Sequence, residues 1–235
     1  MANDDPNYPL VAPGWKALDQ ACGRIYPGQV PHQFTSEQAY ELDSANPLPA
    51  ICVWEAEGPP AWHYVTYGLS ELFEKSSPRP EISGFGFELS FRLPRTPQHQ
   101  RPPNWPLRVL QGIGNYVMNG HGQLDTGHVM DLGGPIMGAE ESALATALEG
   151  VICVPDSVLG QGGKLDTPHG SVLFLLLVGL TREEITSLDG WDLARKVGLI
   201  HDITQGGMTE PNRAPWREDP RRVTTLRRYE MKILI

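Results

Sequence analysis

The chain has 235 residues and a formal net charge of −9, from 19 Lys and Arg against 28 Asp and Glu. This acidic balance argues against a general nucleic-acid binder, which needs a basic face for phosphate groups. Glycine and proline contribute 25 and 22 residues, so a helical bundle or coiled coil is excluded. The composition instead predicts strands and short helices joined by many turns, around a core of ordinary size.

Membrane-spanning, secreted and metal-binding classes lack their usual signals. No stretch approaches the roughly 20 apolar residues that cross a bilayer, and the acidic start of the chain does not resemble a secretory signal. Cys22, Cys52 and Cys153 are far apart in the sequence and form no C-x-x-C pair, so we expect buried free thiols. These features predict a cytoplasmic protein without a cofactor or a membrane partner.

In the first half of the chain, a helix and three strands are expected. Trp15, Leu18, Cys22 and Ile25 share one helical face, between Pro13-Gly14 and Pro27-Gly28. Residues 49–54 and 62–67 have the composition of strands, and residues 70–73 could form one helical turn. From Phe85 to Leu93, apolar and polar residues alternate, which predicts a strand buried on one face only.

In the second half, helices and strands are interspersed. Asn104 is expected to cap a helix that carries Leu110, Ile113 and Val117, and residues 151–154 and 172–178 have strand length. Thr181 and Glu184 form a capping-box pattern. Further expectations are a helix at 191–197 capped by Asp189, a strand at 199–203, and either state at 142–148. The mixed order predicts an α+β fold, a mixed β-sheet with packed helices.

The C-terminal residues differ in charge from the rest. Residues 211–235 hold seven basic and three acidic groups, a net charge of +4, which leaves −13 on residues 1–210. We therefore expect a domain at residues 10–205 and a basic C-terminal extension at residues 206–235. The extension could dock on the domain, stay solvated or bind a partner, and residues 229–235 could form a strand.

Few residue patterns indicate chemistry. There is no Walker A motif, dinucleotide fingerprint or nucleophile elbow, and His63 and His169 are expected to be structural. His121, Asp125, His128 and Asp131 lie in a glycine-rich segment where they could converge on a divalent metal, as in a metal-assisted hydrolase. They could also make the hydrogen bonds of turns and caps, which we favour over a metal site.

Several segments resemble one family, Suppressor of fused. The similarity is carried by Trp62-His63-Tyr64, by the run from Ser83 to Leu93, by Pro102 to Pro106, and by Thr167 to Gly170 with the strand that follows. It covers roughly residues 10–205 in one order, and resembles the N-terminal half of the animal proteins or a stand-alone bacterial domain. It implies a mixed α/β domain.

The resemblance also implies a function. Animal members are not enzymes; they sequester Gli transcription factors by holding a peptide between two halves as an added strand. A contact tyrosine of that family matches Tyr116, whereas Gly127 stands where the family has a contact aspartate. Bacterial relatives resemble immunity proteins that block a toxin by stoichiometric binding. We therefore expect a non-enzymatic protein-binding domain, either of this type or with another regulatory sequestering role, with partner contacts at Tyr116, His121, Asp125, His128 and Asp131.

Overall fold

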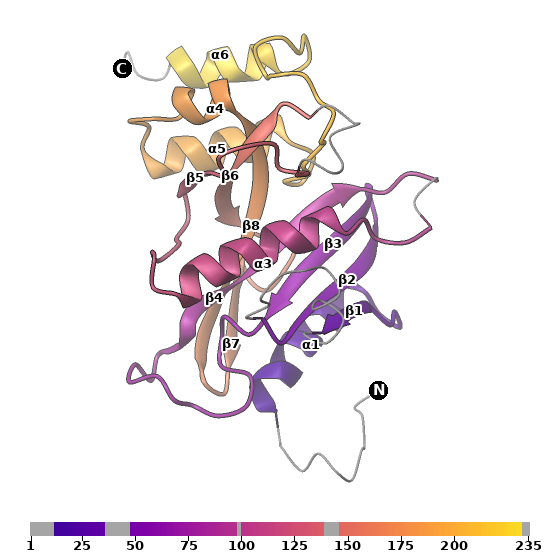
Figure 1. Cartoon of the computed structure of the whole chain (residues 1–235), viewed down its shortest axis with the longest axis vertical. Helices are drawn as coiled ribbons and strands as arrows, with labels where there is room; N and C mark the ends of the chain where they lie inside the picture. The colour runs from indigo at the N-terminus through magenta and orange to yellow at the C-terminus, as the bar shows by residue number, and fades with distance from the viewer. Residues whose placement is uncertain (1–11, 36–47, 98–99, 139–145, 232–235) are drawn as a thin grey trace.

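The computed structural model describes residues 12–35, 48–97, 100–138 and 146–231, which form one mixed eight-stranded sheet with helices on both faces (Figure 1). The strand order is β1-β2-β3-β4-β8-β6-β5, and β7 pairs with β8 beside this path. The strands are β1 (His32–Thr35), β2 (Ala50–Glu57), β3 (Pro60–Tyr67), β4 (Ile82–Pro94), β5 (Val129–Asp131), β6 (Leu148–Pro155), β7 (Lys164–Thr167) and β8 (Gly170–Thr181). The helices are α1 (Pro13–Ile25), α3 (Trp105–Met118), α4 (Arg182–Ser187), α5 (Leu193–Ile203) and α6 (Val223–Met231).

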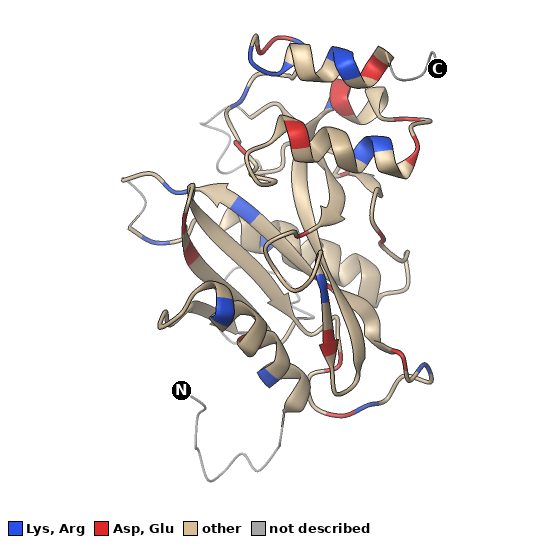
Figure 2. Ribbon diagram, turned by 180° about the vertical axis from the view of Figure 1, so that it is seen from behind, with Lys and Arg blue, Asp and Glu red and all other residues tan. Residues whose placement is uncertain are grey.

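The two faces of the sheet carry different helices. On β8, Leu175 and Leu177 belong to the core under α3, together with Leu110 and Ile113 of that helix. Residues of the opposite parity on β8 face α1 at one end of the strand and the C-terminal helices at the other. Figure 2 shows this second face, with α1 over one part of the sheet and the C-terminal helices over another.

Most of the predicted elements are confirmed. The helix expected around Trp15 is α1, the stripe from Leu110 to Val117 lies on α3, and the four apolar strands are β2, β3, β6 and β8. The capping box is complete, because Thr181 accepts a hydrogen bond from the Glu184 amide and Glu184 accepts one from the Thr181 amide. Asn104 does precede α3, but its side chain makes no capping hydrogen bond.

The prediction that β4 is half-buried is wrong. Glu88, Ser90 and Arg92 point to the face opposite Leu89 and Phe91, yet all three are buried. Their partners come from elsewhere in the chain: Ser70 binds Glu88, Asp156 binds Ser90, and the Gly206 carbonyl binds Arg92. The polar face of β4 is thus covered by segments whose own polar groups hydrogen-bond to it.

Three expectations for helices and strands outside the sheet core are also wrong. Residues 199–203 are helical, because Leu199, Ile200 and Ile203 lie on one side of α5 and pack on β6 and β8. The cap of that helix is Asp192, which accepts from the Arg195 amide, and not Asp189. Residues 70–73 form bends and no helical turn, and residues 142–145 lie outside the described residues.

The C-terminal segment docks on the domain. Trp216, Leu226 and Tyr229 are buried in a cluster with β6, β8 and α5. Where a strand at 229–235 was expected, residues 229–231 belong to α6, and residues 232–235 lie outside the described part. Its arginines pair with acidic groups of the domain, including Arg217 with Glu183. Packing of residues 206–231 is therefore observed, whereas a domain boundary at residue 205 stays a prediction.

Two further expectations concern thiols and membranes. Cys22, Cys52 and Cys153 are free and buried, as predicted. Within the described residues, no helix has the length and apolar character needed to cross a bilayer.

Candidate functional site

Strand β5 ends the sheet and leaves one side unpaired among the described residues. Within the described ranges its one neighbour is β6, with Met130 opposite Val151. The His128 carbonyl accepts from the Cys153 amide and the Leu132 amide donates to the Glu149 carbonyl, both at 2.9 Å. Because backbone groups alternate in direction along a strand, the N–H and C=O groups of Val129 and Asp131 point away from β6. No strand in the part of the chain that the structure describes pairs with this side of β5, so a further strand could add to it.

A groove lies beside this open edge, between α3 and the segment that contains β5. Its volume is about 390 Å³. We call it the β5 groove; it is lined by Arg108, Val109, Gly112, Ile113, Tyr116, Met130, Asp131, Leu132, Pro135, Ile136 and Gly138. A Cβ atom added to Gly112 would meet no atom within 4 Å, so the absence of a side chain there opens the groove. An apolar groove next to a free strand edge suits a peptide in extended conformation.

Tyr116 and His121 lie together at one end of this groove. The Tyr116 side chain projects from the last turns of α3 and is 39% exposed. The His121 ring lies 5.5 Å from the Tyr116 ring, between centroids, and Gly122 is small enough to fit against the phenol. Both sequence-predicted residues are therefore exposed to a partner.

The other three predicted contact residues serve the turns around β5. The His128 Nδ1 atom accepts a 3.0 Å hydrogen bond from the Asp125 amide, and the Asp125 carboxylate accepts from the Thr126 amide. Asp131 lines the groove; its carboxylate accepts from the Gly133 amide and pairs with Arg182, and these contacts lower its pKa. The five residues thus border one edge of the sheet without converging on one point.

The metal-site alternative finds no support in this geometry. Within the described ranges, which include all four residues from His121 to Asp131, no three His, Cys, Asp or Glu side chains are placed to hold a metal ion. Asp125, His128 and Asp131 instead make the hydrogen bonds of turns, as the other interpretation of this segment expected.

Gly127 occupies the position where the resemblance led us to look for an aspartate. Its φ of +84° lies in the left-handed region, and a Cβ atom added there would come within 2.6 Å of Leu193 Cδ1. The backbone conformation therefore disfavours a side chain at this position, whereas the exposed end of Leu193 could move aside.

Sequence reasoning missed a buried polar network beneath the opposite face. The Tyr26 hydroxyl lies 2.6 Å from His63 Nδ1, and His63 Nε2 lies 2.8 Å from Asp156 Oδ2. Ser90 Oγ donates to the same Asp156 oxygen at 2.7 Å. Since Ser90 and His63 both bind the carboxylate, they form no nucleophile–base pair, and all four residues are buried. The network fixes the loop after β6, because Asp156 also accepts from the Val158 amide.

Ionisation follows from this burial. Desolvation raises the pKa of Tyr26 to about 12. For Asp156, burial opposes ionisation, but His63, Arg92 and Ser90 together hold its pKa below the usual range. A carboxylate whose pKa is depressed by folding stabilises the native state above its unfolded pKa, and this contribution is lost as the pH falls through the folded pKa.

We therefore expect Asp156→Asn to lower the free energy of unfolding by about 3 kcal/mol at pH 7, since His63 and Ser90 lose a charged acceptor. The loss of stability that the wild type shows below about pH 4 should also be smaller in the variant. Thermal unfolding between pH 2 and 7 measures both effects. Asp125→Asn, at an exposed turn, is the control and should leave the curve unchanged; a variant curve parallel to the wild type would contradict this role.

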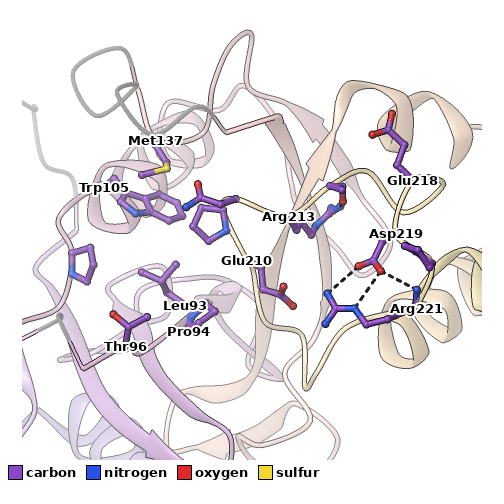
Figure 3. A pocket seen from close by; sticks show the side chains of 15 residues that line it. Leu93, Pro94, Thr96, Trp105, Met137, Glu210, Arg213, Glu218, Asp219 and Arg221 are labelled. Atoms are coloured by element: carbon purple, nitrogen blue, oxygen red, sulfur yellow. Dashed lines mark hydrogen bonds and ion pairs between the residues drawn. The ribbon is translucent and has the colours of Figure 1, made fainter.

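A larger cavity lies between the end of β4 and the C-terminal segment, with a volume of about 760 Å³ (Figure 3). One wall is apolar and includes Leu93, Trp105 and Met137. On the other wall, Asp219 is paired with Arg221, as the dashed lines in Figure 3 show. No residue of β5 lines this cavity, and we place the candidate site at β5 because that strand ends the sheet.

Comparison with known proteins decides the family. The model of the family described as Suppressor of fused protein matches residues 44–214. The chain belongs to the Suppressor of fused family. It is 30% identical over 229 residues to the Suppressor of fused homolog of Homo sapiens, and the match covers 92% of this chain and 43% of the human protein. The chain thus spans less than half the length of the curated relatives it matches.

Solved structures of Suppressor of fused proteins share this fold. Drosophila Suppressor of Fused superposes with a TM-score of 0.78 at 29% identity, covering 94% of this chain and 55% of the other. A Sufu–Fu complex structure gives a TM-score of 0.76 at 28% identity, covering 92% and 97%. A SUFU homolog from Neisseria gonorrhoeae has a TM-score of 0.56 at 15% identity, covers 86% of this chain and 96% of that chain, and shows the fold alone. Both the family and the α+β fold class predicted from the sequence are confirmed.

Proposed function

We propose that this Suppressor of fused domain binds a protein partner and performs no catalysis. The observation that carries the proposal is the free edge of β5 beside an apolar groove with exposed Tyr116 at its end. Backbone groups of Val129 and Asp131 would pair with an extended segment of the partner, and the β5 groove would take its side chains. A relative at 28% identity has been crystallised as a Sufu–Fu complex, which supports a protein as the ligand.

Contact roles follow from position. Tyr116 and His121 would pack on the partner, since rigid aromatic side chains bury a large area at low entropic cost. Asp125 and His128 shape the turn that leads into β5, and Asp131 offers a carboxylate at its end. No cofactor or metal takes part in this scheme.

For the partner, we propose a toxin that the domain blocks by stoichiometric binding in the cytoplasm. The net charge of −9 favours a basic partner, because complementary charge raises the association rate. Three free buried thiols suit a reducing compartment. Inhibition by steric blocking requires that the domain bind the toxin tightly and cover its active site. It requires no chemical step by this chain.

Capture of the partner tests this function. Tagged wild-type protein is used to isolate binding proteins from the native host, and the purified pair is then measured by calorimetry. We expect one-to-one binding, inhibition of the partner's toxicity at equimolar ratio, and a loss of about 2 kcal/mol of binding free energy in Tyr116→Ala.

A matched exposed residue controls for nonspecific loss. Val30 is 85% exposed and lies away from the β5 groove, so Val30→Ala should bind like the wild type. Equal binding by the wild type and Tyr116→Ala would contradict the site. A partner whose own activity is unaffected by equimolar domain would contradict the immunity role.

A further inference from the structure

Strand β5 has little to hold it in place. It contains three residues, pairs with one strand within the described ranges, and lies between Gly127 and Gly133, both with left-handed φ values. Such a short terminal strand opens easily, because few hydrogen bonds must break. If a partner strand is to pair with Val129 and Asp131, β5 must already be extended.

Arg182 ties the end of β5 to β6. Its Nε atom donates to Glu149 Oε2 at 2.8 Å, and its Nη1 atom pairs with Asp131 Oδ2. Glu149 lies on β6, and its backbone carbonyl accepts from the Leu132 amide. One guanidinium therefore bridges the two strands beside the last backbone hydrogen bond between them.

The helix that carries Arg182 is itself firmly placed. Arg182 is the first residue of α4, directly after the capping-box residue Thr181. Glu184, the other member of the box, is buried and bound by Arg213 of the C-terminal segment. A side chain that starts from so fixed a backbone loses less entropy on pairing than one on a free loop.

We propose that Arg182 is a positioning residue that fixes β5 in the extended, paired conformation to which a partner strand adds. This role rests on the proposed function, because it matters only if β5 is the docking edge. Arg182 need not touch the partner. Its two ion pairs are solvent-exposed, so their effect on global stability is small, while their effect on opening of β5 is direct.

Amide hydrogen exchange of the free protein tests the proposal. In Arg182→Gln, exchange in the peptide 127–132 should be about two- to tenfold faster than in the wild type, since one or two exposed ion pairs are lost. Exchange in 172–178 of β8 should not change. Arg182→Lys, which keeps the charge but not the fork of donors, should lie between the two.

Arg217→Gln is the matched control. The Arg217 side chain is 48% exposed against 54% for Arg182, and its ion-pair partners, Glu183 of α4 and Glu230 of α6, both lie outside β5. It should leave exchange in 127–132 at the wild-type rate.

Two results would overturn the proposal: unchanged exchange of β5 in Arg182→Gln, or equal acceleration of β5 and β8, which would make Arg182 a general structural residue. Neither depends on a partner. A failure here is therefore distinct from a failure of the proposed function, which binding by Tyr116→Ala reports.

Discussion

Replacing Arg213 with alanine is expected to lower the free energy of unfolding by about 3–5 kcal/mol. The Arg213 and Glu184 side chains are 6% and 4% exposed, and the guanidinium binds both carboxylate oxygens. Arg213 also donates to the Gly179 carbonyl of β8 at 2.9 Å. Alanine would leave a buried carboxylate with the Thr181 and Trp216 amides but no counter-charge. Urea unfolding at pH 7 measures the change.

Arg217→Ala is the control, because Arg217 pairs with Glu183 and Glu230 at the surface. Exposed ion pairs contribute about 0–1 kcal/mol, so this variant should unfold near the wild-type midpoint. If Arg213→Ala unfolded as late as Arg217→Ala, the buried pair would not be what holds the C-terminal segment.

The Arg213–Glu184 pair shows why the basic C-terminal segment is not an independent, positively charged tail. The positive charge expected to lie on a tail is largely neutralised within the fold, by Glu184 for Arg213, by Glu210 for Arg222 and by Asp202 for Arg228. Burial of Trp216 and Leu226 then adds apolar area to the same contact. Composition alone indicates the charge of a segment but not the location of its counter-ions.

The central strands and their helices could be predicted from sequence because their signals are local. Apolar runs such as 172–178, the stripe on α3 and the capping box of α4 each arise from residues a few positions apart. The α+β class follows from their order. Strands β1, β5 and β7 have three or four residues and no alternation long enough to detect, so pairing with longer strands defines them.

Two of the misjudged elements, β4 and residues 199–203, share a physical cause, which is burial by distant segments. Alternation along β4 correctly separates its two faces, but the loop at Asp156 and the segment at Gly206 cover the polar one. Likewise, residues 199–203 are apolar enough for a strand. They are helical in the fold because one side of this helix packs against both the sheet and α6. Local patterns predict the direction in which a side chain points, but they do not predict which distant segments will cover it.

For the candidate site, the sequence identified residues but not their geometry. Tyr116 and Asp131 line one groove and His121 lies against Tyr116, whereas Asp125 and His128 serve a turn. Neither the open edge of β5 nor the groove has a sequence signature, because both depend on which strand ends the sheet. Gly112 illustrates this: helix propensity predicts that a glycine weakens α3 there, whereas in the fold it leaves open space in the groove.

Replacing Gly112 with leucine should abolish most partner binding while stabilising the domain. A Cβ atom at residue 112 would meet nothing within 4 Å, so the added side chain can enter the β5 groove without disturbing α3. Leucine is a better helix former than glycine by about 0.8 kcal/mol, whereas the filled groove should cost about 2 kcal/mol of binding, roughly a thirtyfold weaker Kd.

Gly23 of α1 provides the matched control, because an added Cβ atom there also meets nothing within 4 Å and the residue lies in a helix away from the groove. Gly23→Leu should therefore raise stability by a similar amount and leave binding unchanged. Calorimetric titration of the captured partner, with thermal unfolding of the same samples, separates the two effects. For Gly112→Leu, the more stable helix should raise the unfolding temperature, and the filled groove should weaken binding. Full-strength binding by a well-folded variant would therefore mean that the partner does not use this groove.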